Sequence, residues 1–307
     1  MNIIRASRDF RNRISNIHVT PKRHYKIHNF QNKTHQGYYT NHFEVDQKLC
    51  VPPILIYSVG KVGSTSVEVS LTKAHIKNPI FHVHRLTWHT LEKSHEYYRN
   101  AGLDVPSHVM VGEYLRFIID RTRGKARWKI ITLTRDPTAQ TISSLFENLE
   151  THPQFRNLSG DDLIKGILAL LEKRFNEFDE EHGYSNNWFD WELKNVFSFD
   201  VYAEDFEPEA GYKIAKSENA DILILKLENL SRCAPEAFQK FLGLQNFQLI
   251  KANEGSDKSY KEVYQRVLST LSLPRDTVER IYRSRYVRQF YTDEEINAFK
   301  RRWTRND

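Results

Sequence analysis

The feature that most constrains the fold of this chain is the alternation of short apolar runs with longer stretches of helical periodicity. The apolar runs have the length of buried strands and cover Ile54–Tyr57, Ile80–His84, Trp128–Thr134, Val196–Tyr202 and Asp221–Leu227. Helical spacing covers Ser64–Ala74, Leu86–Asn100, Tyr114–Arg123, Asp136–Glu150 and Asp161–Asp179, and most of the chain after Pro235. Strands that alternate with helices in this way predict an α/β fold, with an open parallel sheet and flanking helices.

The composition excludes several classes of protein. No apolar run approaches the roughly 18–20 residues that cross a bilayer, so we expect no transmembrane segment. The first residues carry Arg5, Arg8, Arg11 and Arg13 and no apolar stretch, which is not the pattern of a secretory signal. Cys50 and Cys233 are too few for a disulfide framework and suit a reducing compartment. The sequence therefore predicts a cytoplasmic protein.

The positive charge of the chain is concentrated near its start. The net charge is +6, and residues 1–40 carry eight Lys or Arg against the single acid Asp9. We therefore divide the chain into a basic, flexible arm over residues 1–48 and one α/β domain over residues 49–307. A nucleic-acid binder usually gathers its charge on a folded face, so no nucleic-acid partner is expected. The arm is either a solvated tail or a weak contact to an anionic membrane surface.

A glycine-rich segment, Gly60-Lys61-Val62-Gly63-Ser64-Thr65-Ser66, lies between the first predicted strand and the first predicted helix. Glycines let backbone N–H groups converge, and the positive end of the helix dipole attracts an anion. Lys61 adds a cation, and the three hydroxyls add donors. The triphosphate loop G-x-x-x-x-G-K-[ST] does not fit, because Lys61 precedes Gly63 and Ser64 stands where its lysine belongs. The segment predicts a site for a terminal phosphate or a similar anion.

A second phosphate site is predicted where the third strand ends. Arg135 follows the strand Trp128–Thr134, and Asp136-Pro137 opens a helix that carries Ser143. Arginine offers a planar fork to a phosphate, and serine offers a short hydroxyl donor. The carboxyl ends of parallel strands share one edge, where ligands bind. Two phosphate sites at neighbouring strand ends imply a nucleoside with phosphates at its 5′ and 3′ positions.

These motifs resemble those of carbohydrate sulfotransferases that use 3′-phosphoadenosine 5′-phosphosulfate (PAPS). The segment Gly60–Ser66 is similar to their 5′-phosphosulfate loop, and Arg135-Asp136-Pro137 with Ser143 is similar to their 3′-phosphate motif. Later segments resemble bacterial sulfotransferase-like proteins of capsular polysaccharide synthesis; they are Asn186-Asn187-Trp188-Phe189-Asp190, Asn253–Tyr264, Tyr282–Tyr286 and Phe290–Glu295. The resemblance implies a P-loop-like sulfotransferase fold, PAPS as co-substrate, and a carbohydrate acceptor.

The implied reaction moves a sulfuryl group to a sugar hydroxyl, and it requires a cation at the leaving phosphate and a general base. Lys61 and the loop N–H groups suit the first task. For the base, His82 and His84 share one face of the second strand, and we favour His84, which is nearer the strand end. Glu113 and Glu147 remain alternatives. Lys258 is expected, from the resemblance, to close over the 3′-phosphate.

Other interpretations of the same sequence remain open at this point. No further Cys or His stands at ligand spacing from the two histidines, so we expect no metal. A kinase-like phosphotransferase would use the same open sheet. A third hypothesis is a non-catalytic partner in capsule assembly that keeps the fold without turnover.

Overall fold

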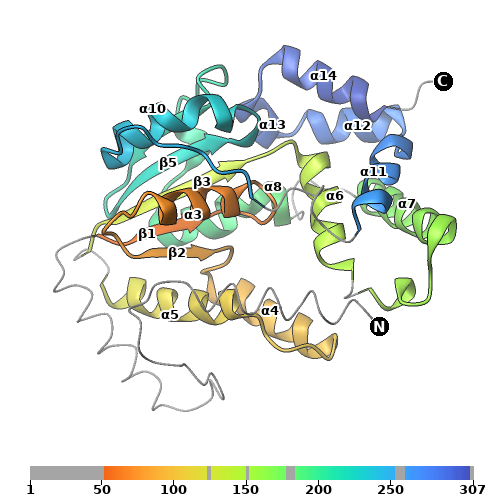
Figure 1. Ribbon diagram of the computed structural model, residues 1–307, viewed down its shortest axis with the longest axis horizontal. Coiled ribbons are helices and arrows are strands. Elements are labelled where there is room, and N and C mark those ends of the chain that lie inside the picture. The colour runs from red at the N-terminus through yellow and green to blue at the C-terminus, as the bar shows by residue number, and fades with distance from the viewer. Residues whose placement is uncertain (1–51, 123–125, 150–151, 178–183, 253–259, 305–307) are drawn as a thin grey trace. The chain divides into compact units, whose positions relative to one another are not determined.

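Four of the five predicted apolar runs and one further segment form a five-stranded sheet within the part of the chain that the computed structural model describes, which is residues 52–122, 126–149, 152–177, 184–252 and 260–304. The strand order is β2-β1-β3-β5-β4, and the strands are β1 (Ile54–Tyr57), β2 (Ile80–Val83), β3 (Trp128–Thr134), β4 (Tyr212–Lys216) and β5 (Ala220–Lys226). β4 pairs antiparallel with β5 at one edge, and the other pairings are parallel (Figure 1). The expected α/β architecture with flanking helices is confirmed, and the sheet is parallel as predicted except at the β4 edge. The predicted arm and Lys258 lie outside the described residues.

The centre of the sheet is also the centre of the core. All four residues of β1 are fully buried, and β3 and β5 are buried at every position except the second. Such continuous burial is typical of parallel strands covered on both faces. Helix α3 (Ser64–Lys73) packs on β1 and β2, α5 (Ser107–Arg121) packs on β2, and α10 (Leu230–Leu242) packs on β4 and β5 (Figure 1).

The other helices cover the rest of the described chain. Before β4 lie α4 (Trp88–Asn100), α6 (Pro137–Glu147), α7 (Gly160–Asn176), α8 (Tyr184–Trp188) and α9 (Asn195–Phe197), with a π-helical segment, Phe189–Lys194, between the last two. The C-terminal third is helical, as predicted, and contains α11 (Lys261–Thr270), α12 (Arg275–Tyr282), α13 (Arg285–Phe290) and α14 (Asp293–Trp303).

The order of the strands creates a switch point between β1 and β3. From β1 the chain passes through α3 to β2 on one side, and it later returns to place β3 on the other side of β1. At such a point the connections leave in opposite directions, so a crevice opens at the carboxyl ends of the two strands. The glycine-rich segment follows β1, and Arg135 follows β3. The topology therefore places both predicted phosphate motifs at one crevice.

Two expectations about the elements were wrong. Val196–Tyr202 is not a strand: α9 ends there, Ser198 takes a left-handed φ of 54°, and a 3₁₀ turn covers Val201–Ala203. Its apolar side chains are buried by helical packing, so their character alone did not determine the element. The edge strand β4 was not predicted, because its sequence, Tyr-Lys-Ile-Ala-Lys, is only partly buried and half polar.

Candidate functional site

The glycine-rich segment forms a tight turn between β1 and α3. Lys61 and Gly63 have positive φ angles, 69° and 88°, in the left-handed region. A Cβ atom on Gly63 would lie 2.5 Å from Cδ1 of Leu227, so this position requires glycine for space as well as for conformation. Turns with left-handed residues bring successive backbone N–H groups together. The segment thus has the backbone form of an anion-binding turn.

Helix α3 adds its positive end to this turn. Its first turn contains no acidic residue, and no side chain caps it. The first N–H groups of a helix have no acceptor within the helix, so they are available to an anion. The predicted side chains differ in where they lie: Val62 is buried, Thr65 is half-buried, and the Ser66 hydroxyl binds the backbone of Ala252, at 3.0 Å from its nitrogen and 3.2 Å from its oxygen.

Arg135 reaches from the end of β3 to the turn after β1. Its Nη1 donates to the carbonyl oxygen of Lys61 at 2.8 Å. Gln140, in the first part of α6, holds the same turn by donating from Nε2 to the carbonyl oxygen of Gly60 at 2.8 Å. The two predicted phosphate motifs are thus in direct contact.

The Lys61 side chain pairs with the far end of α6. Its Nζ lies 3.1 Å from Oε2 of Glu147, and both side chains are partly exposed. Ser143 lies between Gln140 and Glu147 on this helix, and residues three and four apart share a helix face. Ser143 therefore lies on the face of α6 that meets the glycine-rich turn, as its predicted role requires.

Aromatic side chains from the C-terminal helices hold the turn at Arg135 and Asp136. The Tyr286 hydroxyl donates to the Arg135 carbonyl oxygen and accepts from the Arg135 N–H, both at 3.0 Å. Tyr282 donates to one oxygen of the buried Asp136 carboxylate, and Trp303 Nε1 donates to the other at 2.9 Å. These bonds fix the backbone from which the Arg135 side chain departs.

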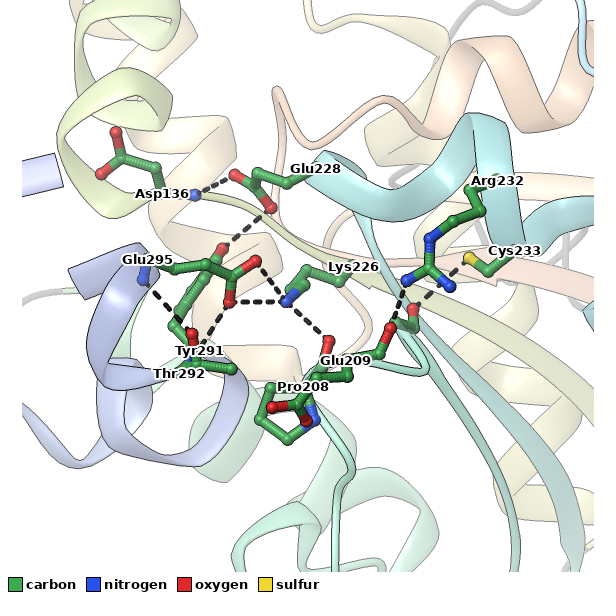
Figure 2. Close-up of polar contacts among 11 residues, drawn as sticks. Asp136, Pro208, Glu209, Lys226, Glu228, Arg232, Cys233, Tyr291, Thr292 and Glu295 are labelled. Atoms are coloured by element: carbon green, nitrogen blue, oxygen red, sulfur yellow. Dashed lines mark hydrogen bonds and ion pairs between the residues drawn. The ribbon is translucent and has the colours of Figure 1, made fainter. Parts of the chain in front are cut away.

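A second carboxylate supports the same turn from the 3₁₀ turn Leu227–Asn229, directly after β5. Figure 2 shows Glu228 between the backbone nitrogen of Asp136, which donates to it at 2.7 Å, and the Tyr291 hydroxyl, which donates at 3.2 Å. Beside it, the fully buried Lys226 pairs with Glu295 at 2.7 Å (Figure 2). Glu228 is acceptor-only when ionised, so it complements two donors and stabilises the position of the turn.

The predicted histidines lie beside the turn, with their ring centroids 5.0 Å apart. His82 has both ring nitrogens in contact: Nδ1 lies 2.7 Å from Oε2 of Glu68, and Nε2 lies 2.9 Å from Oγ of Ser64. Glu68 was not predicted, although its position four residues after Ser64 puts both on one face of α3.

His84, the residue predicted as the base, contacts the backbone through one ring nitrogen. Its Nδ1 lies 2.8 Å from the Ser58 carbonyl oxygen, which only accepts, so Nδ1 carries the hydrogen and Nε2 keeps its lone pair. Nε2 lies 4.0 Å from the place a Cβ of Gly60 would occupy. Burial, with His82 and His108 nearby, holds the pKa of His84 well below its usual range, which keeps the ring neutral. His108, 5.8 Å from His84 between ring centroids, was not predicted.

The remaining predicted residues include Glu113, Trp188 and Phe189. Glu113, an alternative base, pairs with His95 at 2.6 Å rather than with the turn. Trp188 and Phe189 are core residues. Within the described residues, no group of three or more His, Cys, Asp or Glu is placed to hold a metal ion, and no helix there has the length and apolar character to span a membrane.

Comparison with known proteins links part of the chain to capsule synthesis. A search of curated proteins finds no match, and a search of solved structures finds none either. Residues 162–292 match the model of the NKWYS family, described as "putative capsular polysaccharide synthesis protein". The matched region includes the Asn186–Asp190 segment and the tyrosines that hold the Arg135 turn. The predicted resemblance to capsular polysaccharide synthesis proteins is confirmed over these residues.

Proposed function

We propose that this protein is a sulfotransferase that moves a sulfuryl group from PAPS to a sugar hydroxyl in capsular or extracellular polysaccharide synthesis. One observation carries the proposal: the Arg135 guanidinium and the Lys61 turn are 2.8 Å apart at the switch point of the sheet. This hydrogen bond runs from the guanidinium to the carbonyl oxygen of Lys61, so it joins the two predicted motifs, and a single nucleotide with phosphates at its 5′ and 3′ positions would contact both. A cytoplasmic location, in the reducing compartment that the cysteine content suits, is part of the proposal.

The turn and α3 would hold the 5′-phosphate of the donor. As the bond between sulfur and the bridging oxygen breaks, negative charge grows on the phosphate. Lys61, the N–H groups of the turn, and the hydroxyls of Ser64 and Thr65 would stabilise that charge. One well-placed donor of this kind contributes about 3–4 kcal/mol to transition-state stabilisation.

Arg135 and Ser143 would hold the 3′-phosphate. Tyr286 bonds the Arg135 backbone, Glu228 accepts from the neighbouring Asp136 N–H, and the carbonyl oxygen of Lys61 holds the guanidinium itself, which supports this role. A cation held in one geometry loses less side-chain freedom when the ligand arrives, so more of its interaction contributes to affinity.

His84 would take the proton of the acceptor hydroxyl at Nε2. The sulfuryl group passes from the bridging oxygen to the acceptor oxygen, the phosphate keeps the electron pair of the broken bond, and the hydroxyl proton moves to His84. The lowered pKa of His84 keeps it in the base form at neutral pH. The carbohydrate acceptor is supported by the capsular polysaccharide family match.

Glu147 would have to release Lys61 before the lysine could contact a phosphate. The pair is partly exposed, and exposed pairs of this kind contribute only about 0–1 kcal/mol. A dianionic phosphate is therefore a stronger partner than the carboxylate, and exchange is expected on binding.

The first experiment compares nucleotides by thermal shift. 3′-Phosphoadenosine 5′-phosphate should raise the Tm well above any shift from AMP or from ATP with Mg²⁺. Arg135→Ala should weaken its binding by about 2–3 kcal/mol. The matched control is Arg127→Ala. Arg127 precedes β3, at the end of the strand opposite Arg135, and it pairs with Asp221 at 2.8 Å. Stabilisation by ATP with Mg²⁺ alone would instead indicate a phosphotransferase.

The second experiment follows transfer of labelled sulfate from PAPS to capsular glycan precursors. Lys61→Ala should reduce turnover by roughly 10²–10³-fold. His84→Ala should abolish turnover and leave nucleotide affinity unchanged. A protein that binds the nucleotide and transfers sulfate to none of the glycan pools would be a non-catalytic partner in assembly, and the proposal would be wrong.

A further inference from the structure

Three side chains form a hydrogen-bonded chain that ends in the glycine-rich turn. Ser64 and Glu68 lie one helical turn apart on α3, and His82 of β2 spans the gap between them. The two contacts measure 2.9 Å at Ser64 Oγ and 2.7 Å at Glu68 Oε2. The His82 and Glu68 side chains are only 14% and 24% exposed, and Ser64 is buried. The chain is therefore held in one arrangement by packing.

The chemistry of the partners fixes most of the protons in this chain. An ionised carboxylate only accepts, so His82 Nδ1 carries a hydrogen that it donates to Glu68. In the neutral imidazole, Nε2 then accepts, and the Ser64 hydroxyl donates to it. The Ser64 oxygen thus directs lone pairs, and not its hydrogen, toward the rest of the turn, which opposes an anion there.

A second proton on His82 would reverse the last hydrogen bond. Nε2 would then donate to the Ser64 oxygen, and the Ser64 hydrogen would be released to the turn. The Glu68 carboxylate would stabilise the imidazolium through Nδ1. We propose that His82 is a positioning residue that takes up one proton from solvent when the turn binds an anion and so makes the Ser64 hydroxyl a donor to that anion. This proposal rests on the anion-binding role of the turn in the proposed function.

The other titratable and charged groups near His82 do not replace it in this role. They are Glu68 on α3, His84 and Arg85 directly after β2, and His108 on α5. Burial lowers the pKa of His84 well below its usual range and the pKa of His108 to about 4. Both rings therefore stay neutral near neutral pH, whereas His82 contacts the Glu68 carboxylate.

The test uses inorganic sulfate, because its charge does not change over the pH range of the experiment. Titration calorimetry at several pH values, each in two buffers of different ionisation enthalpy, gives the Kd and the protons taken up per sulfate. We expect uptake of up to about one proton, and a Kd that rises by up to about tenfold per pH unit as the pH increases.

Variants separate this mechanism from a merely structural role. His82→Asn, Glu68→Gln and Ser64→Ala should each remove most of the pH dependence and the proton uptake. The matched control is His95→Asn, because His95 and Glu113 form a similar pair, at 2.6 Å, between α4 and α5. This control should keep the wild-type pH dependence. Loss of the dependence in His84→Asn, with its retention in His82→Asn, would overturn the proposal.

The experiments distinguish failure of the role proposed for His82 from failure of the proposed sulfotransferase function. Sulfate that binds with proton uptake through His82, in a protein that does not bind 3′-phosphoadenosine 5′-phosphate, would support the positioning role and refute the sulfotransferase. Nucleotide binding without any His82-dependent proton uptake would refute the positioning role and leave the sulfotransferase standing. Sulfate that does not bind at all would refute the positioning role, and the nucleotide thermal shift would then decide the sulfotransferase separately.

Discussion

Replacing His108 by asparagine should flatten the acid side of the stability profile of this protein. In the folded chain, burial lowers the pKa of His108 to about 4, and repulsion from Arg85, and from His82 when it is protonated, adds to the effect. In the unfolded chain the ring titrates at its ordinary value, about 6.5. Between these values the unfolded state binds more protons than the folded state. The contribution of His108 to the free energy of unfolding is therefore fully present above about pH 6.5 and is lost as the pH falls toward about 4.

The magnitude follows from the shift of His108. A shift of about 2.5 units corresponds to about 3 kcal/mol over the whole range, of which about 2 kcal/mol falls between about pH 7 and about pH 5. Urea unfolding at these two pH values measures the loss in free energy of unfolding. The wild type should lose about 2 kcal/mol more than His108→Asn over this interval.

A matched control isolates the burial of the ring. His89 is exposed on α4, and His89→Asn should follow the wild-type profile. The quantity to compare is the change in the free energy of unfolding with pH. The stability of a variant at neutral pH is not the test, because the substitution also changes packing. Equal slopes for the wild type and His108→Asn would show that the ring is not held neutral by burial, and the argument for a neutral His84 beside it would fall as well.

Three further substitutions test other parts of the site. Glu147→Gln removes the carboxylate that pairs with Lys61, so the Kd of sulfate should fall by up to about fivefold by calorimetry; a weaker complex would contradict the proposed exchange. Asp136→Asn places an amide against the donors Tyr282 and Trp303 and should lower the free energy of unfolding by about 2–4 kcal/mol, whereas a neutral effect in urea would deny these bonds a stabilising role. Glu192, which is fully buried, accepts from the Tyr57 hydroxyl at 2.5 Å and from the Leu86 N–H at 2.8 Å; Glu192→Gln should cost about 3 kcal/mol in the same assay, and full stability would refute this account.

The sequence determines the central strands well because their burial is nearly continuous. The bounds of β1 and β3 agree with the predicted runs, and β5 differs from its run by one residue at each end. A continuous apolar run is a poor criterion where side chains are buried by helix packing or where a strand lies at the edge of the sheet. Val196 and Phe197 are buried at the end of α9, and the edge strand β4 leaves polar residues facing outward. Short apolar runs alone do not distinguish a strand from a buried helix end.

Part of the candidate site could likewise be predicted from local sequence motifs, and part depends on residues that are distant in the sequence. The glycine-rich turn and Asp136-Pro137 are local motifs, and the structure has them at the predicted ends of strands. The supporting residues belong to distant parts of the chain: Glu228 and Tyr286 contact the Arg135 turn from 92 and 151 residues away. No local pattern connects such positions, so the network around the turn could be found only from the folded structure.

The bond between Trp303 and Asp136 has a consequence for how the protein matures. These residues are 167 positions apart, and Tyr282 is 146 positions from the same carboxylate. A nascent chain that has already folded its sheet would still lack the hydrogen bond from Trp303 to Asp136, beside Arg135, until α14 emerged from the ribosome. The proposed nucleotide site would therefore be completed late in translation, after the sheet that carries it.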